Sequence, residues 1–259
     1  MDLKGQRAVI VGGATGIGAA VCRALVARGA SVHVCDLDAE AAARLQAEFP
    51  KGVVTTYRCD VTKPETLSAA AAAIRKVGDV QLLFVNAGVA SVKPFLQTTP
   101  ADWQWLLGIN LFGTVNTIQA FLPGLLAQEG RARIVVTSSV TAIRFTPTPE
   151  VSMYIASKSA QLGLCLALQL ELEQTNVDLS VIFPAGVRTS IAEHSEGSRA
   201  GAFQPTSGSG GRGEAIDAEV AGERIVKAVE QGRTFISTHP EEADAVRELR
   251  DALVGAFTE

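Results

Sequence analysis

Several features are scarce in this sequence, and each scarcity excludes a class of protein. Charged residues make up 19% of the 259 residues and apolar residues 47%, a composition that favours a buried core over disorder. The formal net charge is −4, from 23 Lys and Arg against 27 Asp and Glu. Without a basic run, a nucleic-acid partner is not expected. No uninterrupted apolar run reaches about 18 residues, so we expect no membrane-spanning helix and no membrane partner.

Cysteines and targeting signals are also scarce. The four cysteines lie at positions 22, 35, 59 and 165, without C-x-x-C or metal spacing. We therefore expect buried reduced thiols and no metal site. The N-terminal residues contain no basic segment followed by an apolar one, so no secretory signal is expected and the expected location is cytoplasmic.

The order of apolar segments predicts the fold class. Short β-branched strands are expected at residues 7–11, 31–35, 53–58, 81–85, 134–137, 177–183 and 234–237. Helical patterns are expected at residues 16–28, 38–48, 64–77, 100–126, 151–174, 218–231 and 240–257. This alternation predicts one α/β domain over residues 1–259, a Rossmann-type doubly wound parallel sheet of about seven strands with helices on both faces. The glycine- and serine-rich residues 190–213 are expected to form a mobile lid over the substrate.

A glycine-rich turn lies between the first predicted strand and the first predicted helix. Gly12, Gly16 and Gly18 would leave the backbone N–H groups at the helix N-terminus open to a pyrophosphate. The alternative is a glycine-rich turn that binds no ligand. The position directly after the first strand favours a dinucleotide site.

A carboxylate at the end of the second predicted strand indicates which dinucleotide binds. Asp36 can accept hydrogen bonds from both hydroxyls of an adenosine ribose, and it would repel a 2′-phosphate. Leu37 and Asp38 follow it, and Thr15 stands where a basic side chain could otherwise reach that phosphate. We therefore expect NAD rather than NADP. The alternative role for Asp36 is a helix N-cap.

The candidate catalytic groups are a tyrosine and a lysine with helical spacing. Tyr154, one of two tyrosines in the chain, lies four residues before Lys158, so both share one face of the predicted helix. Thr137-Ser138-Ser139 lies at the end of the fifth predicted strand, where open α/β sheets place their active sites. A positive charge about 4 Å from the phenol is worth roughly 4 kcal/mol at an effective dielectric of about 20. That could bring the tyrosine pKa from about 10 towards 7.

With these motifs the chain resembles the short-chain dehydrogenase/reductase family, in the branch with the Tyr-x-x-x-Lys signature. The resemblance rests on Gly12-x-x-x-Gly16-x-Gly18, Asp36, Asp60-Val61, Asn86-Ala87-Gly88, Asn110, Ser139, Tyr154-x-x-x-Lys158 and the segment from Pro184 to Thr189. Within the family, the chain is most similar to dehydrogenases of secondary alcohols, often benzylic or otherwise hydrophobic ones.

The resemblance implies roles for individual residues. Tyr154 would be the general acid or base, Lys158 would bind the nicotinamide ribose and lower the tyrosine pKa, and Ser139 would hold the substrate oxygen. Asn110 would support a water that relays protons to Lys158. The implied cofactor contacts are Gly12, Thr15, Gly16, Ile17, Gly18, Asp36, Leu37, Asp60, Val61, Asn86, Ala87, Gly88, Tyr154, Lys158, Pro184, Val187 and Thr189.

The sequence departs from the family pattern at three places. Val85 replaces an asparagine, Ala185 replaces a glycine, and the 15-residue gap from Ser139 to Tyr154 is about two residues longer than usual. Because of that gap, Ser138 and Thr141 remain alternatives to Ser139 for the hydroxyl that polarises the substrate.

The expected substrate contacts are mostly apolar. They are Ser91, Phe95, Thr141, Phe145, Ala185 and Gly186. No arginine or lysine among them would bind an anion, so we expect a neutral, hydrophobic secondary alcohol or ketone. The tryptophans at 103 and 105 and the histidines at 33, 194 and 239 receive no chemical role.

These observations predict an NAD-dependent alcohol dehydrogenase or ketone reductase. The alternative is an NAD(H)-binding regulatory protein that keeps the fold without significant turnover. The resemblance further implies that the C-terminal segment, residues 218–259, closes the fold and builds a homotetramer, a dimer of dimers.

Overall fold

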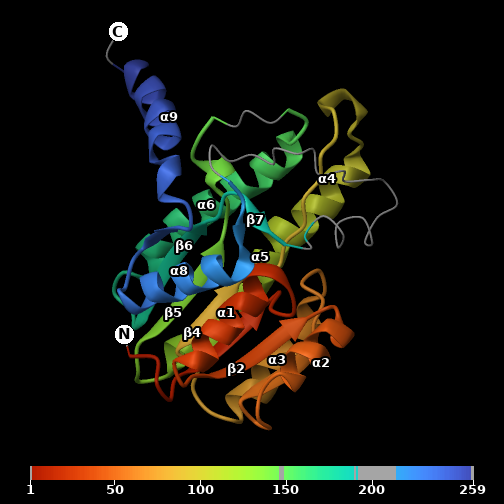
Figure 1. Ribbon diagram of the computed structural model, residues 1–259, viewed down its shortest axis with the longest axis vertical. Coiled ribbons are helices and arrows are strands. Elements are labelled where there is room, and N and C mark those ends of the chain that lie inside the picture. Colours follow the sequence, from red (N-terminus) through yellow and green to blue (C-terminus); the bar gives the residue numbers. More distant parts are fainter. Residues whose placement is uncertain (1, 146–148, 190, 192–213, 258–259) are drawn as a thin grey trace.

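A computed structural model describes residues 2–145, 149–189, 191 and 214–257, and a parallel sheet forms its centre (Figure 1). The strand order is β3-β2-β1-β4-β5-β6-β9, and every neighbouring pair is parallel. The strands are β1 (Arg7–Val11), β2 (Ser31–Asp36), β3 (Val54–Arg58), β4 (Leu82–Val85), β5 (Ala132–Thr137), β6 (Val177–Phe183) and β9 (Phe235–Ser237). This is the Rossmann-type sheet that the sequence predicts. The strand order reverses between β1 and β4, the position at which such sheets bind ligands.

Helices cover both faces of the sheet, and each face has its own apolar core. The helices are α1 (Gly16–Ala27), α2 (Ala39–Ala47), α3 (Pro64–Arg75), α4 (Pro100–Leu107), α5 (Gly113–Ala127), α6 (Ser152–Leu172), α8 (Ala218–Glu230) and α9 (Ala243–Gly255). Helices α1, α2 and α8 pack on one face, and α3, α5 and α6 pack on the other. Successive residues of a strand point to opposite faces, so Ile10 belongs to the first core and Val9 to the second. Strands buried on both faces explain the continuous apolar runs in the sequence.

The helical region after β4 differs in detail from the predicted single helix. A π-helical segment, η2 (Gly108–Phe112), lies between α4 and α5. Over Pro100–Ala127 the mean hydropathy of an 18-residue window reaches 1.2, so length and composition alone would allow this region to cross a membrane. Its apolar residues instead pack on the sheet and on α3, as in the core helix of a globular protein. Single-turn π segments often occur at functional sites.

The C-terminal part of the chain adds to both the sheet and the site. A two-stranded parallel sheet pairs β7 (Val187–Arg188) with β8 (Ile216–Asp217). Strand β9 pairs with β6 at the edge of the large sheet, and the short 3-10 helix η4 (Pro240–Glu242) follows. Helix α9 extends away from the body of the molecule (Figure 1), and Ala245 is its buried residue. Apart from Ile191, the predicted lid lies outside the described residues.

Candidate active site

A cavity of about 860 Å³ lies along the carboxyl ends of the central strands. Most of the residues that sequence analysis assigns to cofactor binding and catalysis line it. They are Gly12, Thr15, Gly16, Ile17, Asp36, Leu37, Asp60, Val61, Asn86, Ala87, Gly88, Ser139, Tyr154, Lys158, Pro184, Val187 and Thr189. The topology therefore brings segments almost 180 residues apart in sequence to one site.

The glycine-rich turn lines this cavity and has no room for a side chain at Gly12 or Gly18. Gly12 has a φ of +78°, and a Cβ there would lie 2.4 Å from the backbone nitrogen of Ala87. A Cβ on Gly18 would lie 2.1 Å from the carbonyl oxygen of Gly12. Helix α1 begins at Gly16, and the side chain of Thr15 does not cap it. The first N–H groups of α1 are thus placed for an anionic group, as the sequence predicts.

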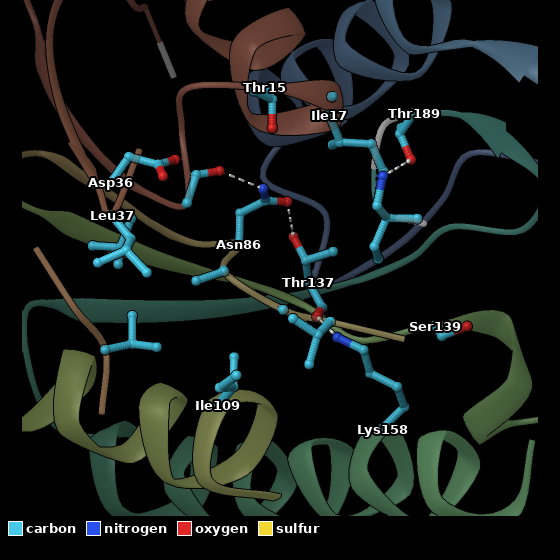
Figure 2. A pocket seen from close by; sticks show the side chains of 18 of the residues that line it. Thr15, Ile17, Asp36, Leu37, Asn86, Ile109, Thr137, Ser139, Lys158 and Thr189 are labelled. Carbon is cyan, nitrogen blue, oxygen red and sulfur yellow. Dashed lines mark hydrogen bonds between the residues drawn. The ribbon is translucent and has the colours of Figure 1, made fainter. Parts of the chain in front are cut away.

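Asp36 occupies the same end of the cavity as this turn (Figure 2). Its Oδ2 accepts a hydrogen bond from the Ala14 N–H at 2.8 Å, and its Oδ1 accepts one from the Asp38 N–H at 3.1 Å. Asp38, not Asp36, is the N-cap of α2, accepting from the Ala41 N–H at 2.9 Å. The N-cap role considered for Asp36 is therefore wrong. The two backbone contacts hold its carboxylate in place and leave further lone pairs for a ligand.

The charges along the cavity differ between its two ends. Asp36, Asp38 and Asp60 follow β2 and β3, whereas Lys158 is the one basic side chain among the described lining residues. Lys158 lies beside the end of β5, away from Asp36 (Figure 2). A 2′-phosphate near Asp36 would meet the negative charge of Asp36 and Asp38, while Lys63 pairs with Asp60 at 3.7 Å.

Asn86 connects the two ends of the cavity. Its Nδ2 donates to the Gly12 carbonyl at 2.7 Å, and its Oδ1 accepts from the Thr137 hydroxyl at 3.0 Å (Figure 2). The ends of β1, β4 and β5 are thereby fixed relative to one another. This contact explains why an amide suits this position: it donates and accepts at once.

Tyr154 and Lys158 project from α6 towards Ser139. The Lys158 Nζ lies 5.8 Å from the centre of the Tyr154 ring and donates to the Thr137 carbonyl at 2.9 Å. The Ser139 hydroxyl is hydrogen-bonded to the Tyr154 phenol. Thr141 donates to the Ser139 Oγ from its N–H at 3.2 Å and from its hydroxyl at 3.0 Å. Because its Oγ accepts from Thr141, Ser139 donates its one proton to the Tyr154 phenol at the cavity wall.

Burial shifts the pKa values of Tyr154 and Lys158, the two candidate catalytic groups. Burial raises the pKa of Tyr154 by more than the hydrogen bond with Ser139 lowers it. Burial also lowers the pKa of Lys158 to about 7. Both shifts favour the uncharged forms because the surrounding protein solvates charge poorly. For the phenol to ionise near neutral pH, additional positive charge must therefore enter the cavity.

The two alternatives to Ser139 have other partners. The Ser138 hydroxyl donates to the Lys158 carbonyl at 2.9 Å and is buried. Thr141 supports Ser139, as described above, and does not line the cavity. These contacts favour Ser139 as the group that meets the substrate.

Asn110 lies behind the cavity, in the π-helical segment. Its side chain exchanges two hydrogen bonds with the backbone of Val89, at 2.8 and 3.0 Å, and donates to the Ser157 Oγ at 3.0 Å. The main-chain carbonyl of Asn110 accepts hydrogen bonds from Thr114 Oγ1 and Gln161 Nε2, both at 2.8 Å. Asn110 thus joins the segment after β4 to α6. The water relay that the resemblance implies stays a prediction.

The predicted substrate residues are only partly brought together. Ala185 lines the cavity, whereas Ser91, Thr141 and Gly186 do not, and Phe95 and Phe145 are exposed. Because residues 146–148 and 192–213 lie outside the described chain, these substrate contacts stay predictions.

Sequence reasoning missed one wall of the cavity. Gln104, Trp105 and Ile109, from α4 and the π-helical segment, line it. Trp105 and Ile109 are four residues apart and share a helix face. That spacing was the available signal, but it is equally typical of core packing.

Comparison with known proteins decides the family. The family model described as short chain dehydrogenase matches residues 6–199. The chain belongs to this family of oxidoreductases. Its relatives include the C alpha-dehydrogenase of Sphingobium sp., 30% identical over 98% of this chain and 87% of that protein. Galactitol 2-dehydrogenase of Cereibacter sphaeroides is 32% identical over 73% of this chain and 74% of that protein.

Solved structures support the same family and fold. A short-chain dehydrogenase/reductase from Burkholderia phymatum, in complex with NAD, is 30% identical with a TM-score of 0.84, over 95% of this chain and 93% of that one. A short-chain dehydrogenase from Burkholderia cenocepacia, in complex with NADP, has a TM-score of 0.78 at 24% identity, over 100% of both chains. The fold therefore accommodates either nucleotide, and members of this family use NAD(P).

Proposed function

We propose that this short-chain dehydrogenase is an NAD-dependent oxidoreductase that interconverts a neutral, hydrophobic secondary alcohol and its ketone. One observation carries the proposal. Ser139 and Lys158 lie at one end of a single cavity whose other end holds Asp36 (Figure 2), and Tyr154 contacts both Ser139 and Lys158. A cavity that runs from Asp36 to Tyr154 suits a dinucleotide, whose adenosine would lie at Asp36 and whose reactive ring would lie beside Tyr154.

The residues present fit NAD. The cradle at Gly12 and Gly18 would be filled by any Cβ, and the N-terminus of α1 would face the pyrophosphate. The oriented carboxylate of Asp36 can receive both ribose hydroxyls, and the acidic residues beside it disfavour a 2′-phosphate. Charge at this end therefore supports NAD over NADP.

The chain's own groups would handle the proton. In alcohol oxidation, Tyr154 Oη removes the hydroxyl proton, and in ketone reduction it returns one. Ser139 donates a hydrogen bond to the substrate oxygen where negative charge develops. NAD⁺, when bound, supplies the hydride acceptor and a positive charge close to the phenol. Lys158, held by Thr137, favours the phenolate whenever it is protonated.

An apolar wall supports a hydrophobic substrate. Val89 and Trp105 line the cavity and belong to a small apolar cluster with Met153, the residue before Tyr154. Gln104 is the polar side chain beside Trp105 on this wall. A polyol would leave most of its hydroxyls unpaired against such a wall, at a cost of about 1–3 kcal/mol for each buried group.

A substrate panel tests the proposal. We expect NADH formation with aryl and other hydrophobic secondary alcohols to exceed that with polyols, measured by absorbance with NAD and with NADP. Tyr154→Phe removes the proton acceptor but keeps the ring, so it should lower kcat by about 10²–10⁴-fold and leave NAD binding nearly intact. No turnover on any class by a protein that binds NAD would instead indicate the regulatory function.

We also propose that the protein assembles as a homotetramer in the cytoplasm. Large apolar side chains are exposed on α6 and on the C-terminal segment: Leu166, Leu170, Phe235, Leu253, Val254 and Phe257. Exposed apolar side chains on two separate surfaces suit an assembly with two kinds of interface.

A further inference from the structure

The segment between β9 and α9 buries three polar side chains. Thr238 is 0% exposed, His239 1% and Glu242 2%. Buried polar side chains are costly unless they are paired. Each pairing made by this segment therefore indicates what the segment holds in place.

His239 contacts the backbone that follows β6. Its Nε2 lies 3.0 Å from the Gly186 carbonyl oxygen, and its Nδ1 lies 3.4 Å from the Ala185 nitrogen and 2.7 Å from the Thr238 hydroxyl. The tautomer with its proton on Nε2 fits these contacts: Nε2 donates to Gly186, and the single lone pair of Nδ1 accepts from the Thr238 hydroxyl, with the Ala185 N–H as a weaker second donor. The imidazole is thus matched to the path of the Ala185–Gly186 backbone.

Glu242 contacts the segment that follows β5. Its carboxylate lies 3.3 Å from the Arg144 guanidinium, and the side chains are 2% and 0% exposed. Arg144 comes five residues after Ser139, just beyond the short 3-10 helix η3 (Val140–Ala142). A fully buried ion pair contributes little net stability compared with apolar side chains, but separating its members leaves a buried charge without its counter-charge, so the two side chains stay together.

These two contacts hold opposite segments of one site. The segment after β5 carries Ser139, and the segment after β6 carries Pro184 and Ala185, all of which line the cavity. The two segments are also joined directly, because the Val140 N–H donates to the Pro184 carbonyl at 3.0 Å. Ser139 lies near Lys158 and away from Asp36 (Figure 2), and the Val140–Pro184 contact places the segment after β6 beside it.

We propose that residues Thr238–Glu242 form a positioning element for the catalytic end of the cavity, with His239 and Glu242 as its positioning residues. The inference rests on the proposed function, since it concerns the same cavity. His239 sets the backbone that would lie against the nicotinamide, and the Arg144–Glu242 pair sets the segment that carries Ser139. The adenosine end does not depend on either contact.

Nucleotide binding tests the role of His239 without requiring a substrate. We compare NAD with ADP-ribose, which lacks the nicotinamide, by calorimetry on the full chain. His239→Leu removes the donor to Gly186 and should weaken NAD binding about tenfold, the effect of about 1.4 kcal/mol, while ADP-ribose binding changes less than about twofold. His239→Gln places an amide N–H near the Nε2 position and should restore NAD binding to within about threefold of wild type.

His239→Asn is the matched control for this experiment. Its shorter amide reaches the Nδ1 position and leaves Gly186 without the donor, so it should bind NAD as weakly as His239→Leu. If His239→Leu does not fold, the NAD affinities of the His239→Asn and His239→Gln variants are compared with each other instead. Equal NAD binding in the Asn and Gln variants, or parallel weakening of NAD and ADP-ribose, would overturn the inference. A wild-type protein that binds neither ligand would overturn the proposed function itself.

The ion pair has its own test. Replacing both members together, Arg144→Met with Glu242→Leu, leaves no buried charge, so the unfolding midpoint should change little. We expect kcat on the best substrate of the panel to fall at least about tenfold, with ADP-ribose binding unchanged. Wild-type kcat in a folded double variant would show that the pair does not position Ser139.

Discussion

At the residue scale, the chemistry of the site depends on how each side chain is held. Asp36 is fixed by two backbone N–H groups, Ser139 by Thr141, and Lys158 by the Thr137 carbonyl. Such contacts orient polar groups before a ligand arrives, which reduces the reorganisation needed during binding and reaction. Substitutions at these positions should therefore alter specific steps and leave the fold intact.

Asp36 should control the choice between nucleotides. Replacing it by asparagine, Asp36→Asn, removes the negative charge and one acceptor for the ribose hydroxyls. We expect the ratio of kcat/KM for NAD to kcat/KM for NADP to fall about 10–100-fold, measured by steady-state kinetics. Glu65→Gln, an exposed acidic position in α3 away from the cavity lining, serves as the charge-matched control. A wild type that already prefers NADP would contradict the role given to Asp36.

Lys158 should make the stability of the nucleotide-free protein depend on pH. Its pKa is about 7 when folded and near the ordinary value of 10.5 when unfolded. Above pH 7 the unfolded chain therefore binds more protons than the folded protein, and the free energy of unfolding rises with pH.

Lys158 should contribute a slope of about 1 kcal/mol for each pH unit between pH 7 and 8, and the ionisation of unfolded cysteines, whose ordinary pKa is about 8.5, adds a contribution of opposite sign. Urea unfolding at several pH values measures it. Lys158→Met keeps a similar length and cannot titrate, so this part of the slope should vanish. Identical slopes in the two proteins would contradict the pKa shift of Lys158.

At the element scale, close approach decides which positions tolerate a side chain. The turn between β1 and α1 is packed against the turn after β4, and Gly18 faces the Gly12 carbonyl. Helix α6 also contains a glycine, Gly163, but a Cβ there would meet nothing within 4 Å. Close packing therefore requires a glycine at position 18, whereas it does not require one at position 163.

Gly18→Ala should destabilise the protein by about 1–3 kcal/mol, because the backbone must move to admit the methyl group. The displaced turn should also weaken NAD binding. Gly163→Ala is the matched control, and helix propensity predicts about 0.5–1 kcal/mol of added stability. Chemical unfolding and calorimetry measure both effects. Tolerance of alanine at position 18 with normal NAD binding would show that the turn is not a tight cradle.

At the scale of the whole molecule, exposed apolar residues indicate assembly. Leu170 on α6 is 75% exposed, and Leu166, one turn before it, is 44% exposed. Together they form an apolar ridge along the outer face of α6. Such a ridge would be covered if two copies of α6 pack together across a two-fold axis.

Charge introduced on this ridge should therefore disrupt the assembly. We expect wild type to be a tetramer by light scattering and Leu170→Glu to be a smaller species at the same concentration. Glu171→Gln, at the neighbouring exposed position, is the control. A wild type that stays monomeric at every concentration would contradict the tetramer.

The local pattern of the sequence determined much of this protein. The alternation of strands and helices, the glycine-rich turn and the Tyr154–Lys158 pair follow from short-range periodicity and spacing, because hydrogen-bonded elements impose those periods on the chain. The resemblance added the family, which comparison confirms.

Only the tertiary structure decided the rest. Trp105 lines the cavity, Asn110 lies behind it, and burial pushes Tyr154 and Lys158 towards their uncharged forms. His239 reaches Gly186 across 53 positions of sequence. Contacts of this kind have no local signature, since they arise where separate strands end at one edge of the sheet and desolvate each other's side chains.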